Sequence, residues 1–452
     1  MNAQGDYLDQ LARFVGATPF EAIPAPVIER TKEILVDSLA VYATGMRARE
    51  LVVLSARQID GGAAGRAWVI GSGRTCNPID AALLNGIAGA WLDFDEGNTL
   101  ANGHPGVQVI PAALAVAQER GASGRELLAA IALSYEMVAR IGMATKVKLI
   151  VNPHGTFGVA GAALATARLR GMAPDRLRNL ASLAASTCMA TNRHTMKDGA
   201  TVRNWYAGHS GFMGQMAVRL AESGFTGPAD GVNTTFSMVL GDGFAPEVAI
   251  ARLGERWHLL EGYLKVHPTA RYVHSVIDAL EDALARVPDG RLAAENIARI
   301  DVRAYRLAAF LSNPAPANWF GTRFSVPFTL ATLIVGGRDV LAAFGDEAVA
   351  DARVMALASR VEMVEDERFT AAYPAAQRVE LSIHLRDGSR IDGRCEITSG
   401  EPQRPHAAAA LEAKYRDLAV PLWGAERAAQ LRDALLSLEH CRDVSRLVDF
   451  LP

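Results

Sequence analysis

Residues 91–111 read WLDFDEGNTLANGHPGVQVIP and connect two predicted helices. The first helix is predicted to begin with Asn77 as N-cap and Pro78 at the first helical position, because apolar residues recur at helical spacing from there. This helix would place Asp93 and Asp95 in its last turn, where the macrodipole disfavours each carboxylate by about 0.3–1 kcal/mol. A placement that costs helix stability indicates another use for these two side chains.

His104 stands before Pro105, at the start of the following apolar helix. The positive end of that helix favours a neutral imidazole. Such an imidazole beside a carboxylate can take or give a proton near neutral pH. The spacing is equally compatible with a structural interpretation, in which Asp93 and Asp95 bond backbone N–H groups and His104 is an ordinary N-cap.

Length and composition bound the class of protein. A chain of 452 residues predicts two domains, with a large single helical body as the alternative. With 46 Lys and Arg against 49 Asp and Glu, the net charge of -3 excludes a nucleic-acid-binding class but not local cationic pockets. The four cysteines lie far apart without a C-x-x-C pair, which predicts neither a disulfide framework nor a structural zinc site.

The patterning of apolar residues predicts a cytoplasmic protein without a membrane partner. The acidic, amphipathic N-terminus lacks the features of a signal peptide. No window holds about twenty apolar residues in succession. Hydrophobic residues make up 50% of the chain, which predicts a large buried fraction and allows for a subunit interface.

The order of patterns along the chain predicts a mainly α protein with a smaller α+β domain. Helical patterns continue to about residue 262, including a capping box at Ser123 and Glu126. The Ala/Gly-rich run after residue 158 predicts a central helix, because small residues permit close packing. Alternating runs begin at Glu295 and Arg378, the second with a hairpin turn at Asp387 and Gly388.

Helical patterns resume at about residue 405, so we expect the C-terminus to rejoin the first body. The predicted domains are therefore residues 1–264, an all-helical domain; residues 265–404, an inserted α+β lid; and residues 405–452, C-terminal helices that return to the helical domain.

Cationic and imidazole side chains gather in three further segments. They are residues 191–208 with Arg193, His194, Lys197 and Arg203; residues 263–280 with Lys265, His267, Arg271 and His274; and residues 152–156, NPHGT, before the small-residue helix. Free backbone N–H groups at the start of that helix could hold an anion. A single Lys or Arg is usually a solvated surface charge, but clusters at helix starts favour anion binding.

Several motifs are absent. The sequence has no H-E-x-x-H, no G-x-S-x-G and no G-x-G-x-x-G after a strand, so neither a metal site nor a cofactor is predicted. What remains is acid–base chemistry on a small anionic substrate, with Lys and Arg binding its carboxylates.

Seven segments carry a resemblance to a known family. They are LDFDE, HPGVQVIPAALA, GASGRELLAAI, HGTFGVAGAALATARLRGM, ESGFTGP, KVHPTARYVHSVIDAL and FSVPFTLA, in this order between about residues 20 and 400. The chain resembles the MmgE/PrpD family, which includes 2-methylcitrate dehydratase, cis-aconitate decarboxylase and iminodisuccinate epimerase.

The resemblance implies a large all-helical domain built from both chain ends, a smaller α+β lid, a homodimer and a metal-free site between the domains. Position by position, Asp93 and His104 match the family's active-site acid and histidine, and Lys265 matches an active-site lysine.

The chain departs from the decarboxylase pattern at five positions. They are Gly97 for a threonine, Asn152 for a histidine with His154 two residues on, Arg203 for a lysine, Ala270 for a histidine, and Phe328 for a tyrosine. These changes remove two imidazoles and a phenol. Transfer of the decarboxylase activity is therefore not safe, and an arginine fork also binds a carboxylate differently from a lysine.

The sequence thus predicts a cofactor-independent lyase for a small di- or tricarboxylic acid, in first place a hydro-lyase like 2-methylcitrate dehydratase. His104, oriented by Asp93, is the expected base, and either His154 or His274 is the expected acid. The predicted site has Asp93, His104, Lys265 and His154 as catalytic residues and Arg203, Arg271, His274, Asn152 and Lys197 as substrate-binding residues. An isomerase or epimerase, a decarboxylase and an inactive binding homologue remain as alternatives.

Overall fold

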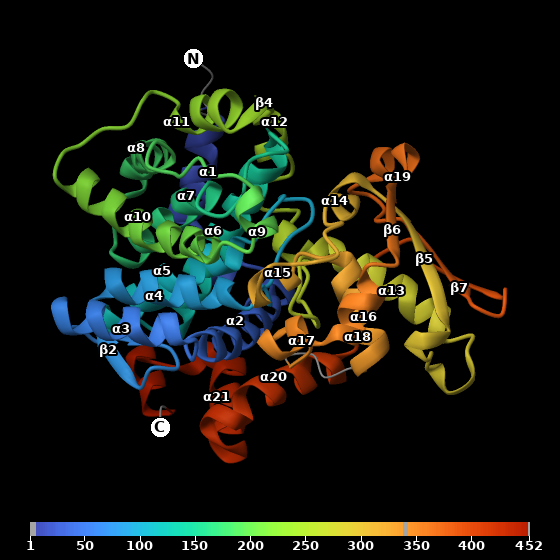
Figure 1. Ribbon diagram of the computed structural model, residues 1–452. Coiled ribbons are helices and arrows are strands. Elements are labelled where there is room, and N and C mark those ends of the chain that lie inside the picture. Colours follow the sequence, from blue (N-terminus) through green and yellow to red (C-terminus); the bar gives the residue numbers. More distant parts are fainter. Residues whose placement is uncertain (1–5, 338–341, 451–452) are drawn as a thin grey trace. The chain divides into compact units, whose positions relative to one another are not determined.

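The computed structural model describes residues 6–337 and 342–450, which form two compact units. The helical unit contains the chain up to Asn192, Asn204–Leu264 and the chain from Ala407 onward. The α+β unit contains Arg193–Arg203 and Lys265–His406. In Figure 1 the blue N-terminal helices and the red helices α20 and α21 belong to the same helical unit. A mainly α fold with a smaller α+β part is therefore confirmed.

The helical unit holds thirteen of the α-helices in the described part of the chain. In chain order they are α1 (Tyr7–Ala17), α2 (Ala25–Gly45), α3 (Arg49–Gly61), α4 (Pro78–Trp91), α5 (Pro105–Arg120), α6 (Gly124–Ala144), α7 (Phe157–Leu169), α8 (Pro174–Ala185), α10 (Trp205–Glu222), α11 (Gly231–Asn233), α12 (Pro246–Ile250), α20 (Ala408–Trp423) and α21 (Ala425–Leu436), followed by a 3-10 helix from Val444 to Phe450. Two short antiparallel hairpins accompany them, β1 (Ala67–Val69) with β2 (Arg74–Cys76) and β3 (Thr145–Val147) with β4 (Gly241–Phe244).

Local side-chain bonds fix several predicted helix starts. The Asn77 side chain accepts the N–H groups of Ile79 and Asp80 at the start of α4. Ser123 and Glu126 form the expected capping box of α6. Both predictions are confirmed, because the residues that decide them lie within one turn of each other.

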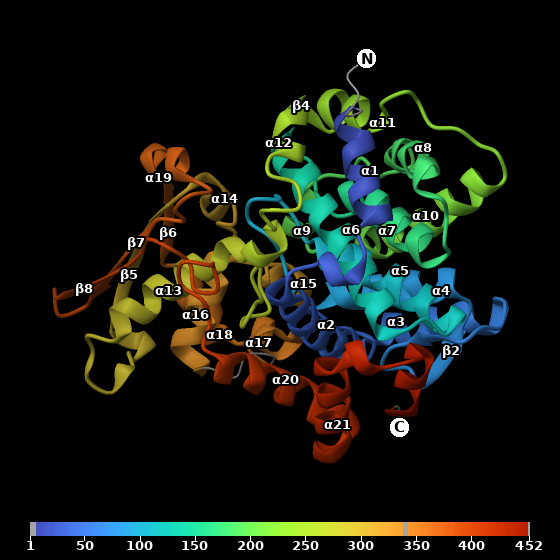
Figure 2. The ribbon, with the colours of Figure 1, turned by 180° about the vertical axis from the view of Figure 1, so that it is seen from behind.

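The core of the helical unit is built on α4, α5, α6, α7 and α10. The Ala/Gly-rich α7 is buried at every position except Arg168 and packs against α5, α6, α8 and α10, which confirms its predicted central place. Helices α20 and α21 pack against α2, as Figure 2 shows from behind. Helix α6 is long and apolar enough to cross a membrane by length and composition alone, but 94% of its most apolar window is buried inside the protein. This burial identifies α6 as a core helix.

The α+β unit is organised on a sheet with strand order β6-β5-β7-β8, in which β5 and β6 are parallel and the other pairs antiparallel. The strands are β5 (Ile297–Ala304), β6 (Val361–Glu365), β7 (Val379–Leu385) and β8 (Arg390–Cys395), and the hairpin between β7 and β8 turns at the predicted residues Asp387 and Gly388. Helix α13 (Arg271–Leu284) packs on β7 and β8. The remaining helices are α9 (His194–Lys197), α14 (Arg306–Ala309), α15 (Trp319–Thr322), α16 (Val326–Gly336), α17 (Asp346–Ala350), α18 (Ala352–Ala358) and α19 (Glu367–Ala372).

Candidate active site

The loop after α4 holds three buried carboxyl groups. Helix α4 ends at Trp91, and Asp93 adopts a left-handed backbone with φ of 49°. The expectation that Asp93 and Asp95 lie in the last turn of the helix is therefore wrong, because the chain leaves the helical path one residue earlier. Asp93, Asp95 and Glu96 are each only 1% exposed. Burial of three acids in one short loop costs free energy unless specific partners compensate it.

Lys414 on α20 holds this loop from the C-terminal side of the chain. Its ammonium donates to the Phe94 carbonyl oxygen at 3.0 Å, lies 4.0 Å from the centre of the Phe94 ring, and pairs with Asp37 at 2.6 Å. Burial raises the pKa of Asp37, and the Lys414 charge opposes that shift. Helix α20, near the C-terminal end of the chain, thus supports Phe94, which lies between Asp93 and Asp95.

Glu96 joins the loop to the start of α5. Its carboxyl group accepts the Gly106 N–H and the Tyr135 hydroxyl, the latter at 3.0 Å. A β-carbon on Gly106 would lie 2.6 Å from the Glu96 oxygen, so this approach requires glycine. Burial and then the Asp95 charge raise the pKa of Glu96 to about 8, against the bonds from Tyr135, Gly106 and Val107, which lower it.

This raised pKa predicts an unusual pH dependence of stability. The Glu96 carboxyl binds its proton more tightly in the folded than in the unfolded protein, whose ordinary value is 4.5. Its contribution to stability is therefore complete below about pH 4.5 and is lost as pH rises through about 8. We expect Glu96→Gln to lose less stability than the wild type between pH 5.5 and 8, measured as the free energy of unfolding in urea.

Glu126→Gln is the control for this experiment, because bonds from Ser123 lower the pKa of Glu126. Its effect should appear on the acid side of the stability profile. Parallel alkaline profiles for the wild type and Glu96→Gln would contradict the expectation.

His104 is the N-cap of α5, as predicted, with Pro105 at the first helical position. Its Nδ1 atom lies 2.6 Å from the carbonyl oxygen of Glu96 and 3.0 Å from the carboxylate of Asp95. Both neighbours are acceptors, so Nδ1 carries the hydrogen and Nε2 is the basic nitrogen of the neutral ring. The carboxylate against this ring is that of Asp95, whereas our sequence analysis gave the orienting role to Asp93.

His154 lies beside His104. The two rings stack with centroids 4.6 Å apart and an interplanar angle of 28°. Nε2 of His154 is 3.7 Å from the Asp95 carboxylate, and Nδ1 is 3.2 Å from the side-chain oxygen of Asn152. The same Asn152 oxygen accepts the backbone N–H of His154 at 3.1 Å. In the helical unit Asn152 is thus a positioning group for His154.

Asp95, His104 and His154 could also bracket a metal ion, because one ligand atom of each lies within 4.8 Å of the others. Two imidazoles and one carboxylate are a common set for divalent transition metals. The Nδ1 hydrogen of His104 already bonds the Glu96 oxygen, so ligation through Nδ1 would have to give up this bond.

We therefore expect chelation to leave the protein unchanged. Dialysis against EDTA should alter neither turnover nor the unfolding midpoint by more than the error of measurement, and elemental analysis should find no stoichiometric zinc, manganese or iron. A visible absorption band on addition of Co²⁺, abolished in His154→Ala, would instead identify a metal site.

The α+β unit contains the second predicted cluster. Lys265 is fully buried, and Arg271 forms an ion pair with Glu401 at 2.8 Å and donates to the Ser399 carbonyl oxygen at 2.8 Å. Burial, and then the charges of Arg271 and other nearby cations, lower the pKa of His274 well below its usual range. His274 is therefore neutral and a weak proton donor, which disfavours one of its two predicted roles.

The first cluster also belongs to the α+β unit. Arg193 donates to the Tyr272 hydroxyl at 3.1 Å. Lys197 lies 4.6 Å from the centre of the Phe310 ring, and the guanidinium of Arg203 is 5.6 Å from that of Phe324. Arg203 is 3% exposed, which is unlike a solvated surface charge.

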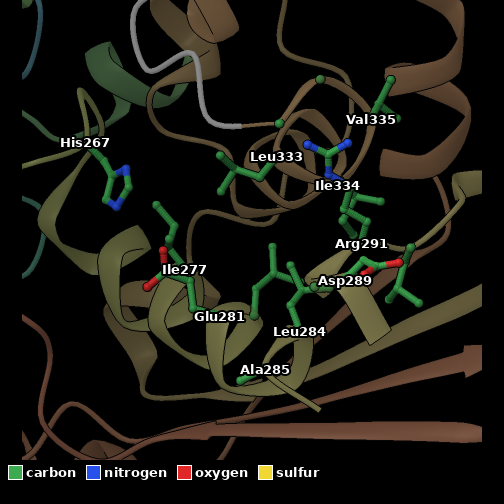
Figure 3. A pocket seen from close by; sticks show the side chains of 15 residues that line it. His267, Ile277, Glu281, Leu284, Ala285, Asp289, Arg291, Leu333, Ile334 and Val335 are labelled. Carbon is green, nitrogen blue, oxygen red and sulfur yellow. The ribbon is translucent and has the colours of Figure 1, made fainter. Parts of the chain in front are cut away.

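A cavity of 710 Å³ in the α+β unit begins near His267. Figure 3 shows its walls, which are mainly the aliphatic side chains of α13 and of the end of α16, with Asp289 and Arg291 away from His267. Its lining residues include one imidazole, His267, and the carboxylates of Glu281 and Asp289, but no stacked pair of imidazoles like His104 and His154, so we place the candidate chemistry at His104.

Four predicted residues, Asp93, His104, Asn152 and His154, lie in the helical unit. There His154 stacks on His104 and contacts the Asn152 side chain. The other five, Lys197, Arg203, Lys265, Arg271 and His274, all lie in the α+β unit. Asp95 stood out in the sequence for its position but was not in the predicted site, and Glu96 was not singled out, although both belong to the motif quoted above. No sequence pattern identified Tyr135 as a site residue, because its contact with Glu96 spans 39 residues.

Comparison with known proteins matches two family models to this chain. The MmgE/PrpD N-terminal domain matches residues 9–242, and the MmgE/PrpD C-terminal domain matches residues 267–440. The chain is 24% identical to cis-aconitate decarboxylase of Aspergillus terreus over all of this chain and 96% of that protein. It is 24% identical to human cis-aconitate decarboxylase, covering 94% of this chain and 90% of that one. It is 26% identical to 2-methylcitrate dehydratase of Cupriavidus necator, covering 72% and 71%. Matches to both domain models over most of its length show that this chain belongs to the MmgE/PrpD family.

Proposed function

We propose that this protein is a lyase that acts on a small di- or tricarboxylic acid without a cofactor, in first place by loss of water. One observation carries the proposal. His104 has its Nδ1 fixed by the Glu96 carbonyl oxygen and the Asp95 carboxylate, which leaves Nε2 as a base, and a second imidazole is stacked on its ring.

The proposed reaction begins at the carbon next to a substrate carboxylate. Nε2 of His104 takes the proton, and the Asp95 carboxylate stabilises the imidazolium that forms. The electron pair of the broken C–H bond forms the alkene while the C–O bond breaks. His154 gives a proton to the departing hydroxyl, which leaves as water.

The negative charge that builds on the substrate needs cations. Lys265 and Arg203, which are both buried, remain the proposed carboxylate-binding residues. Lys197 also stays in the proposed substrate-binding set. We do not extend this role to Arg271, because its guanidinium is already bound by Glu401.

The names of the relatives support a lyase of this kind. A decarboxylase of cis-aconitate and a dehydratase of 2-methylcitrate both act on small carboxylic acids. The four cysteines of the chain, all in its described part, are free thiols, which supports the proposed cytoplasmic setting.

Decarboxylation is the second candidate, because the match to the Aspergillus terreus decarboxylase spans the whole chain and the dehydratase match only 72% of it. The changed positions Gly97, Asn152, Ala270 and Phe328 speak against a direct transfer of that activity. Proton abstraction without a leaving group would give an epimerase, and loss of turnover would give a binding homologue.

Proton NMR in D₂O tests the proposal. Citrate, 2-methylcitrate, cis-aconitate, citramalate and malate are incubated with the wild type and with His104→Ala. A new alkene that the variant does not form supports the hydro-lyase, and loss of carbon dioxide supports the decarboxylase. Deuterium uptake without an alkene would overturn the lyase assignment in favour of an isomerase, and binding without any reaction would identify a binding homologue.

A further inference from the structure

Tyr263 crosses the backbone of Gly97 in the helical unit. Its N–H donates to the Gly97 carbonyl oxygen at 2.8 Å, and the Gly97 N–H donates to the Tyr263 carbonyl oxygen at 3.1 Å. A β-carbon on Gly97 would overlap the Tyr263 hydroxyl and lie 2.5 Å from the ring carbon that bears it. The phenol therefore occupies the space that a side chain at position 97 would take.

This space adjoins the candidate base. Position 97 follows Glu96, whose carbonyl oxygen holds Nδ1 of His104. The Tyr263 ring meets the His104 ring edge-on, with centroids 6.4 Å apart and an interplanar angle of 82°. Tyr263 is 3% exposed, so its hydroxyl is a largely desolvated donor beside the base.

We propose that the Tyr263 hydroxyl donates a hydrogen bond to the carboxylic acid substrate and so replaces a hydroxyl at position 97. Position 97 itself bears only hydrogen here, and the donor arrives instead from a residue 166 positions later in the chain, because 263 − 97 = 166. The inference rests on the proposed function. The phenol keeps its proton throughout, and its hydrogen bond strengthens as charge builds on the substrate oxygen while His104 takes the proton from carbon.

Tyr263→Phe removes only the hydroxyl. Loss of one such donor lowers kcat/KM by about 10²-fold, and the unfolding midpoint should stay unchanged. Tyr415→Phe is the matched control, since Tyr415 is a buried tyrosine of the same unit whose hydroxyl donates to the Ala428 carbonyl oxygen at 2.8 Å. The control should keep its kcat/KM. Equal turnover by Tyr263→Phe and the wild type would overturn the proposal.

Two double variants test whether a hydroxyl at position 97 can replace the one at position 263. Tyr263→Leu withdraws the ring, so that a β-carbon fits at position 97. Gly97→Ser/Tyr263→Leu and Gly97→Ala/Tyr263→Leu then differ by one oxygen. We expect the serine variant to be about tenfold more active than the alanine variant at equal folded fraction, in line with the usual worth of a hydrogen bond to a charged group. Equal activities would show that only steric fit connects the two positions.

Binding of tricarballylate, a saturated tricarboxylate without a leaving group, separates this inference from the proposed function. Calorimetry should show about tenfold weaker binding to Tyr263→Phe than to the wild type. If the wild type converts no acid but this difference in affinity is present, the lyase function fails and the Tyr263 contact stands. Unchanged affinity in the variant, or no binding to the wild type, overturns the Tyr263 contact.

Discussion

Replacing His104 with alanine should lower kcat by about 10²–10⁴-fold, the range for loss of a general base. Among the described residues, Nδ1 of His104 is the only ring nitrogen held by both the Glu96 carbonyl oxygen and the Asp95 carboxylate. The variant lacks this ring. Steady-state kinetics on the acid identified by NMR gives the loss, and deuterium exchange into that acid should fall by the same factor. Added imidazole should restore part of the activity, because the variant leaves a ring-sized space at the start of α5.

The control is His209→Ala. His209 is a half-buried histidine of the same unit whose Nε2 lies 3.2 Å from the Thr187 carbonyl oxygen, so it resembles His104 in burial and in its backbone partner. Burial lowers the pKa of His209, and no role is proposed for it. If both histidine variants lost activity to the same degree, the loss would reflect folding and His104 would not be the base.

The second large effect is expected for Asp95→Asn, which should lower kcat by about 10²-fold. Loss of the carboxylate removes the charge that stabilises the imidazolium of His104. In Ser-His-Asp triads, where the aspartate alone fixes the histidine tautomer, its replacement by asparagine lowers kcat by roughly 10⁴-fold. The loss here should be smaller, because the Glu96 carbonyl oxygen still accepts the hydrogen of Nδ1. Steady-state kinetics on the acid identified by NMR gives the size of this loss.

Asp93→Asn distinguishes the two aspartates of the motif. Asp93 matches the family's active-site acid in sequence, but its substitution should lower kcat less than Asp95→Asn does, because Asp95 is the carboxylate 3.0 Å from Nδ1 of His104. A larger loss in Asp93→Asn than in Asp95→Asn would return the orienting role to Asp93, the residue that the sequence predicted for it.

The local features of the fold could be predicted from the sequence because the residues that decide them are neighbours. Asn77 caps α4 through N–H groups two and three residues away, and Ser123 and Glu126 cap α6 within a single turn. The hairpin between β7 and β8 follows from the turn preferences of Asp387 and Gly388. The change from helical to alternating periodicity likewise separated the helical from the α+β part of the chain.

The motif of residues 91–111 identified the candidate base but not its partners. The sequence placed His104 at the start of α5, which is a matter of helix spacing. It predicted Asp93 as the orienting carboxylate, whereas Asp95 lies against the ring, because the left-handed backbone at Asp93 redirects the chain just after α4 and no side-chain pattern predicts that turn.

Only the tertiary structure decided which distant side chains meet this loop. His154 stacks on His104 across 50 residues, and Lys414 reaches Phe94 across 320. The Tyr263 ring lies where a side chain at Gly97 would stand, a replacement that is invisible in the sequence of either segment. Contacts of this kind depend on the packing of α5, α7 and α20 in one core, because a buried polar group is tolerated only where the whole fold supplies its partner. The sequence by itself therefore determined the helices and pointed to His104 as the candidate base, and the packed helical unit determined the Glu96 hydrogen bond and the Asp95 contact that support this role.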